Sequence, residues 1–198
     1  MTKTYLFPTC HNFPKSGFHF PDITQLLESE PQLYQVIVKD TLSSVRLHSP
    51  DVIVCIESFG YIFGAPIAYV VGCPLVVARR SGKLPRTTVG QAYEMCYSSD
   101  RCIEMNEHAI EQNCKVLIID DFLASGGTFL ACATLAARMG ASTVIGAFAV
   151  ELPQLGGGPR IRSLGYDFTA AMSLQFEDRD SAWCVEKWPS CGRVRNLL

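Results

Sequence analysis

The chain has 198 residues, of which 48% are hydrophobic, and a formal net charge of −2. This length is enough for one domain with a buried core. The near-neutral charge gives no reason to expect nucleic acid or a membrane surface as a partner. The N-terminal residues lack a long apolar core and are interrupted by Pro8 and Pro14, which argues against a signal peptide. No apolar run approaches the roughly 20 residues that a membrane-spanning helix needs.

The nine cysteines form no C-x-x-C pair. An odd number of cysteines without a secretion signal favours free thiols in a reducing compartment, so we expect a cytoplasmic protein. A zinc site made of Cys184, Cys191 and a distant histidine is an alternative use of two of them.

Apolar strands alternate with amphipathic segments along most of the chain. A proline-punctuated segment at 11–24 leads into a helix-like stretch. The elements that follow are a helix over 31–45, a strand over 52–56, a turn over 57–60, a helix over 61–71, strands over 74–78 and 116–119, a helix over 129–139, a strand over 143–152, a turn over 156–159 and a last strand over 166–174. This alternation predicts an α/β fold with a doubly wound, mostly parallel sheet and flanking helices.

Two segments lack such a pattern. Residues 79–101 are polar and glycine-punctuated, and they contain four basic residues, Arg79, Arg80, Lys83 and Arg86. Irregular insertions of this length are usually functional or disordered, so the segment is either a flexible lid loop that closes over a polyanion or a solvated basic loop. The tail over 177–198 shows no element and could pack on a neighbouring subunit.

The stretch KVLIIDDFLASGGT, at 115–128, joins a buried strand to a helix through a loop of small residues. Gly126 and Gly127 let a phosphate approach the backbone, the first turn of the helix offers free N–H groups, and Ser125 and Thr128 add hydroxyls. The loop lacks the lysine of a Walker motif and the G-x-G-x-x-G of a dinucleotide fold. It therefore predicts a phosphate site of another kind.

Two acids, Asp120 and Asp121, directly precede this loop. Carboxylates beside a phosphate repel it unless they bind something else, such as sugar hydroxyls or a metal. Ribose 5-phosphate carries a phosphate and a diol at a suitable separation, so it satisfies both halves of the stretch. The alternative is an ordinary strand-turn-helix corner with a capping acid.

This stretch resembles the phosphoribosyl pyrophosphate (PRPP) signature of type I phosphoribosyltransferases. Over about residues 12–175, the chain is most similar to the adenine phosphoribosyltransferase family. Four further segments match that family's motifs in order and spacing: FPKSGFHFPDIT, ESFGYIFGAPIA, ARRSGKLP and AYEMCY. The resemblance implies a single domain over 1–198 with a small N-terminal hood at about 11–24, a lid at about 79–101 and the tail.

The resemblance also implies the reaction and its partners: adenine and PRPP, with Mg²⁺, give AMP and pyrophosphate. The magnesium would be held mainly by PRPP, with no direct protein ligand. The protein would be a homodimer, with small-molecule substrates and no nucleic acid or membrane partner.

Carried over position by position, the resemblance implies three binding regions and a catalytic group. PRPP and AMP would be bound by Asp120, Asp121, Ala124, Ser125, Gly126, Gly127 and Thr128. Pyrophosphate would be bound by Glu57, Ser58, Phe59, Gly60, Arg79, Lys83 and Tyr97. Residues 17–22 would form the hood over the base, with Phe18, His19, Phe20 and Pro21 as its contacts. The catalytic residues would be Glu94, Cys96 and Asp121.

Three positions depart from the family pattern. Phe59 replaces an arginine whose guanidinium would donate two parallel hydrogen bonds to pyrophosphate. Cys96 replaces the glutamate that would take the proton from purine N9, and a thiol is mostly neutral at pH 7, so Glu94 is the expected substitute. Pro21 has no N–H to donate to N1 of adenine.

These departures leave two alternatives open. A 6-oxopurine such as hypoxanthine, guanine or xanthine carries a proton on N1 and would not need the donor that Pro21 lacks. A non-catalytic paralogue that binds PRPP, as a sensor or as a partner subunit, would also tolerate losses at the pyrophosphate and base positions.

Overall fold

The computed structural model describes residues 6–95, 98–178 and 180–190. Its helices are α1 (Ile23–Ser29), α2 (Pro31–His48), α3 (Gly60–Val71), α4 (Gly127–Met139) and α5 (Gly157–Ser163), with a 3-10 turn η1 at Pro153–Leu155. Its strands are β1 (Leu6–Phe7), β2 (Thr9–His11), β3 (His19–Pro21), β4 (Val52–Ile56), β5 (Leu75–Arg80), β6 (Thr88–Met95), β7 (Ser98–Asn106), β8 (Lys115–Leu123), β9 (Thr143–Glu151), β10 (Asp167–Glu177) and β11 (Ala182–Lys187).

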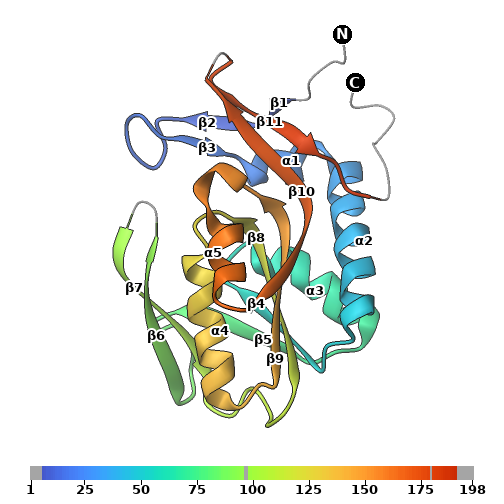
Figure 1. The fold of residues 1–198 in the computed structure, drawn as a ribbon, viewed down its shortest axis with the longest axis vertical. Helices are drawn as coiled ribbons and strands as arrows, with labels where there is room; N and C mark the ends of the chain where they lie inside the picture. The colour runs from blue at the N-terminus through green and yellow to red at the C-terminus, as the bar shows by residue number, and fades with distance from the viewer. Residues whose placement is uncertain (1–5, 96–97, 179, 191–198) are drawn as a thin grey trace.

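One large sheet organises the molecule, in the order β1-β11-β10-β9-β8-β4-β5-β7-β6 (Figure 1). Its centre, from β10 to β5, is parallel, and its two edges are antiparallel. Strands β2 and β3 form a separate antiparallel pair. The predicted fold class, a doubly wound and mostly parallel sheet with flanking helices, is confirmed.

Helices cover both faces of the sheet. Alternate side chains of β4 enter different cores: Ile53 and Cys55 pack with α1, α2 and α3, whereas Val54 and Ile56 pack with α4 and α5. A strand buried on both faces explains why 52–56 reads as an unbroken apolar run. No described helix combines the length and the apolarity that crossing a bilayer would demand.

The basic segment at 79–101 is not the irregular insertion that its composition suggests. Strand β5 continues to Arg80, and most of the remainder belongs to a β6–β7 hairpin that packs beside α4 (Figure 1). The hairpin forms because Tyr93, Ile103 and Met105 bury their side chains against the α4 side of the sheet. The flexibility assigned to this lid stays a prediction.

Two further expectations were wrong. The glycines at 156–159 do not form a plain turn, because α5 begins at Gly157, packed directly against the loop after β8. The strand near 166–174 is not the last one, because residues of the tail form β11, which pairs with β10 and β1. Trp183 of β11 is 5% exposed, so this part of the tail packs on its own chain. Contact of the tail with a neighbouring subunit stays a prediction.

Candidate active site

The phosphate loop joins the carboxyl end of β8 to α4. Gly126 caps α4 in the left-handed conformation, with φ of 78°, which a residue with a side chain rarely adopts. Its carbonyl accepts the first helical hydrogen bond, from the Leu130 N–H at 3.0 Å. The amides of the first helical turn are then directed at the loop, where they suit an anion.

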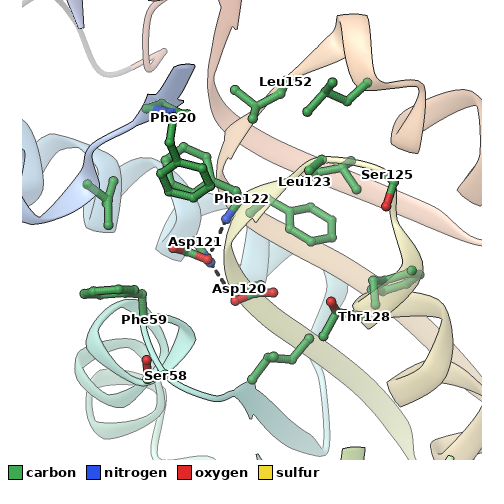
Figure 2. Close-up of a pocket in the computed structure, with 18 of the residues that line it drawn as sticks. Phe20, Ser58, Phe59, Asp120, Asp121, Phe122, Leu123, Ser125, Thr128 and Leu152 are labelled. Carbon is green, nitrogen blue, oxygen red and sulfur yellow. Dashed lines mark hydrogen bonds between the residues drawn. The ribbon is translucent and has the colours of Figure 1, made fainter. Parts of the chain in front are cut away.

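The two acids lie at the end of β8, beside the loop. The Asp121 N–H donates to Asp120 Oδ1 at 3.0 Å, and the Phe122 N–H donates to Asp121 Oδ1 at 2.8 Å (Figure 2). Asp120 is 9% exposed. Burial, with the neighbouring Asp121 carboxylate, raises the pKa of Asp120 well above its ordinary value, and burial also raises the pKa of Asp121. The pair therefore favours a ligand that supplies hydroxyl donors or positive charge.

A second loop, at the carboxyl end of β4, faces the acids. It contains a cis peptide bond between Glu57 and Ser58. Glu57 Oε2 accepts from the Arg80 N–H at 2.8 Å and lies 3.4 Å from Arg79 Nε. Burial alone would raise the pKa of Glu57, but the hydrogen bonds from Arg80 and Arg79 outweigh it and hold that pKa below its ordinary value. This glutamate thus stays ionised and fixes both arginines.

The third wall is the β2–β3 hairpin, which is mostly aromatic on its inner side. The Phe20 ring meets the rings of Phe122 and Phe13 edge-on, each with centroids 5.9 Å apart. His19 stacks on Phe176 at 5.2 Å, and its carbonyl accepts from Trp183 Nε1 at 2.9 Å. An apolar slot of this kind suits a flat ring.

The three walls enclose one cleft of about 580 Å³. Most of the sequence-predicted residues line it: Phe18, His19, Phe20, Pro21, Glu57, Ser58, Phe59, Asp120, Asp121, Ala124, Ser125, Gly126, Gly127 and Thr128. A volume of this size is typical of small-molecule sites. Segments more than a hundred residues apart in the sequence therefore share one site, because the carboxyl ends of parallel strands lie at the same edge of a sheet.

Three described residues that were predicted for the site do not line the cleft, and the side chains of three more lie outside the described part of the chain. Gly60 lies behind its loop at the start of α3. Arg79 donates from Nη1 to the Lys83 carbonyl at 2.9 Å, and neither Arg79 nor Lys83 lines the cavity. Glu94 lies in β6, but its side chain is outside the described part of the chain. Cys96 and Tyr97 also lie outside the described residues.

Two residues that line the cleft were not assigned to the site from the sequence. Arg101 lines the cavity from β7, and Tyr93, its cross-strand partner in β6, lines it together with Thr128. The alternation of Arg101, Ile103 and Met105 could have indicated a strand with Arg101 at the end of its inner face.

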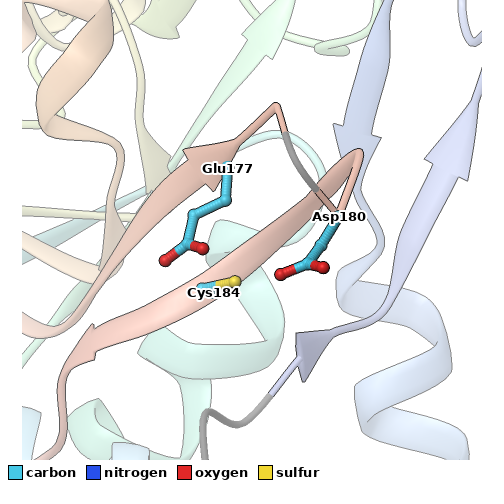
Figure 3. Close-up of side chains that lie close together, drawn as sticks. All are labelled: Glu177, Asp180 and Cys184. Atoms are coloured by element: carbon cyan, nitrogen blue, oxygen red, sulfur yellow. The ribbon is translucent and has the colours of Figure 1, made fainter.

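One group of possible metal ligands lies outside the cleft. Glu177, Asp180 and Cys184 have ligand atoms within 4.8 Å of one another at the β10–β11 hairpin (Figure 3). Asp180 is exposed, and no histidine of the described chain joins the group, as the zinc alternative would require; Cys191 lies outside the described residues. Exposed acids gather often without a metal, so we do not assign one here.

Comparison with known proteins identifies the family. Residues 26–162 match the model of the phosphoribosyl transferase domain. The adenine phosphoribosyltransferases of Actinobacillus succinogenes and Pasteurella multocida are 41% and 42% identical to this chain over 156 residues, which is 79% of this chain and 86% of each relative.

Solved structures agree with this comparison. Adenine phosphoribosyltransferase from Rhodothermus marinus has a TM-score of 0.76 at 34% identity, covering 85% of this chain and 94% of its own. The Giardia lamblia enzyme, complexed with 9-deazaadenine, has a TM-score of 0.77 at 27% identity, covering 83% and 93%. With its phosphate loop, paired acids and domain match, this chain belongs to the phosphoribosyltransferase family, among relatives that are adenine phosphoribosyltransferases.

Proposed function

We propose that this protein is an adenine phosphoribosyltransferase, which joins adenine to the phosphoribosyl group of PRPP. N9 of adenine attacks C1′ of the ribose, the bond from C1′ to pyrophosphate breaks, and N9 loses its proton. The products are AMP and pyrophosphate. The strongest support is one cleft in which an apolar aromatic slot, two acids and a phosphate loop converge, in a chain 41% identical to adenine phosphoribosyltransferases.

In this proposal the acids orient the sugar. Asp120 and Asp121 accept hydrogen bonds from the ribose hydroxyls while the loop from Ala124 to Thr128 holds the 5′-phosphate. The transition state has positive charge on the ribose ring, which the buried carboxylates stabilise, and negative charge on the leaving pyrophosphate. Catalysis therefore rests on fixed charges in a site shielded from water.

Pyrophosphate binding is assigned to the backbone of the Glu57–Ser58 loop, with Arg80 beside it. Magnesium fits the same region, because Mg²⁺ is usually held by substrate phosphates with few protein carboxylates, and the adjacent carboxyl groups of Asp120 and Asp121 line the same cleft. The metal would supply charge neutralisation for the leaving group.

The proton acceptor for N9 is assigned to Glu94, with Cys96 as the weaker candidate. A carboxylate is ionised at pH 7, whereas an ordinary thiol is mostly neutral. Glu94→Gln should lower kcat strongly, and Cys96→Glu, which restores the family residue, should raise it. A pH–rate profile that is unchanged in Glu94→Gln would exclude Glu94 as the base.

A homodimer is part of the proposal. Helix α3 is almost wholly apolar, and its outer face leaves large side chains in solvent, among them Tyr69 at 88% and Val70 at 52% exposure. A second copy that covers this face would bury them. Light scattering of the purified protein measures the oligomeric state directly. The cytoplasmic location stays a prediction.

The experiment that tests the function is a base panel. Purified protein is incubated with PRPP, Mg²⁺ and adenine, hypoxanthine, guanine or xanthine, and pyrophosphate release is followed. Adenine-dependent release is expected. The panel matters because Pro21 lines the cleft without an N–H to donate. Turnover of only 6-oxopurines, or PRPP binding without any turnover, would contradict the proposal.

A further inference from the structure

The inner face of the β6–β7 hairpin brings a cation, Arg101, to the cleft that contains the phosphate loop. Side chains alternate along β7, so Arg101, Ile103 and Met105 share one face. Ile103 and Met105 are 1% and 0% exposed, in the core under α4. Arg101 continues this row beyond the core and lines the cleft, half-buried. The packing of the hairpin on α4 therefore fixes the direction of Arg101.

Tyr93 is the cross-strand partner of Arg101, and it lines the same cleft as Thr128 in the first turn of α4. Burial raises the pKa of Tyr93, and the two side chains are close enough that the Thr128 hydroxyl acts to lower it, as does the positive charge of Arg101. The guanidinium is thus close enough to act electrostatically on a hydroxyl that lies near the loop.

The distribution of charge in the cleft indicates what Arg101 could bind. Asp120 and Asp121 bring two carboxyl groups next to a loop that must receive a phosphate. The residues of the loop offer amide dipoles and hydroxyls, and Arg160 Nη1 donates to the Ser125 carbonyl at 3.2 Å. The guanidinium of Arg79 and the main chain of Arg80 are held by Glu57 at the other end of the cleft. Phe59 contributes no charge. A cation on the α4 side would offset the repulsion between the acids and the phosphate.

We propose that Arg101 is a binding residue for the 5′-phosphate of PRPP and AMP, and that Tyr93 is a positioning residue that holds Thr128 for the same group. The proposal deepens the function proposed above and rests on it. It follows from the shared inner face of Arg101 and Ile103, the cross-strand pairing of Arg101 with Tyr93, and the position of Tyr93 and Thr128 in the same cleft. A planar guanidinium suits a phosphate because it can donate two parallel hydrogen bonds.

The test measures binding of ribose 5-phosphate and of pyrophosphate, separately, by calorimetry. Arg101→Met removes the charge and keeps most of the length, and Arg101→Lys restores a charge. Arg46→Met, on the exposed side of α2, is the matched control. We expect Arg101→Met to weaken ribose 5-phosphate binding about tenfold or more, Arg101→Lys to recover part of it, and pyrophosphate binding and Arg46→Met to match wild type.

Two results would overturn the assignment. One is an unchanged affinity of Arg101→Met for ribose 5-phosphate, and the other is a loss confined to pyrophosphate, which would place Arg101 at the leaving group. Ribose 5-phosphate binds without a purine base, so the outcome of this test does not depend on the outcome of the base panel. If wild type binds ribose 5-phosphate through Arg101 but does not turn over adenine, the proposed activity fails and the phosphate assignment survives.

The role of Tyr93 needs a readout that a loss of packing would not produce. Tyr93→Phe keeps the ring and removes the hydroxyl, and Thr128→Val removes its partner. If Tyr93 acts through Thr128, the two changes are not additive, and the double variant binds ribose 5-phosphate about as weakly as Thr128→Val alone. Additive losses would contradict the positioning role, as would a Tyr93→Phe affinity equal to wild type.

Discussion

The contact between α5 and the phosphate loop yields a sharp prediction at Gly157. A Cβ built at this position would lie 2.2 Å from the Ala124 carbonyl oxygen and 2.9 Å from the Gly126 nitrogen. Both atoms belong to the backbone of the loop, so no flexible side chain can yield. An ordinary contact begins near 3.4 Å, so Gly157→Ala must separate helix and loop by about 1.2 Å.

This displacement acts where the 5′-phosphate is expected to bind. A shift of about 1 Å in positioned groups can cost on the order of 100-fold in rate. Overpacking of this kind also costs about 1–3 kcal/mol of folding free energy. We therefore expect Gly157→Ala to lower kcat/KM for PRPP by about 100-fold, weaken ribose 5-phosphate binding in parallel, and lower the urea midpoint.

Gly165→Ala separates the two effects. Gly165 follows the same helix, has φ of 82°, and has no heavy atom within 4 Å of a built Cβ. An alanine there is strained by roughly 1–2 kcal/mol without touching the loop. Stability should fall in both variants, while activity should fall only in Gly157→Ala. Wild-type ribose 5-phosphate affinity in Gly157→Ala, or an equal activity loss in Gly165→Ala, would refute the steric reasoning.

Three further predictions concern the acids and the pyrophosphate loop. The pKa of Asp120 in the folded protein is raised above its unfolded value near 3.8, so the stability that its protonated form contributes is lost as pH rises through the folded pKa. Asp120→Asn should therefore raise the Tm of the unliganded protein at pH 7, by roughly 2–4 °C per kcal/mol. The difference in Tm between variant and wild type should shrink toward pH 4. A constant gap in melts across that range would refute this. Asp121→Asn should weaken PRPP use about tenfold or more in steady-state kinetics, and an unchanged KM and kcat would exclude its role on the ribose. Phe59→Arg should tighten pyrophosphate binding about tenfold by calorimetry, and an unchanged affinity would mean that backbone groups suffice.

Much of the site could be predicted from the sequence because its signals are local. The apolar run of β4, the acids at the end of β8 and the small residues before α4 each depend on neighbours within a few positions. Their meeting at one edge also follows from the sequence, since parallel strands place their carboxyl ends together.

The lid region shows why the remainder could not be predicted. The family resemblance implies that Arg79 and Lys83 bind pyrophosphate, but Glu57 and the Lys83 carbonyl engage the Arg79 guanidinium, and neither residue lines the cavity. Arg101 enters the cavity because its strand pairs with β6 and packs on α4. Alternation within 101–105 indicates a strand, but the pairing of that strand with β6, its packing on α4 and the contact between Arg79 and Glu57 have no short-range signature in the sequence.

The doubly wound sheet, the phosphate loop with its acids, and the family of the chain can all be inferred from the sequence alone. The folded structure adds that Arg101 lines the cleft, that α5 begins among glycines packed against the loop, and that the tail supplies β11. The physical reason for this difference is that hydrophobic periodicity and small-residue loops depend only on residues that are consecutive in the sequence. Pairings such as that of Trp183 with the His19 carbonyl join residues 164 positions apart, and they exist only after the chain has folded.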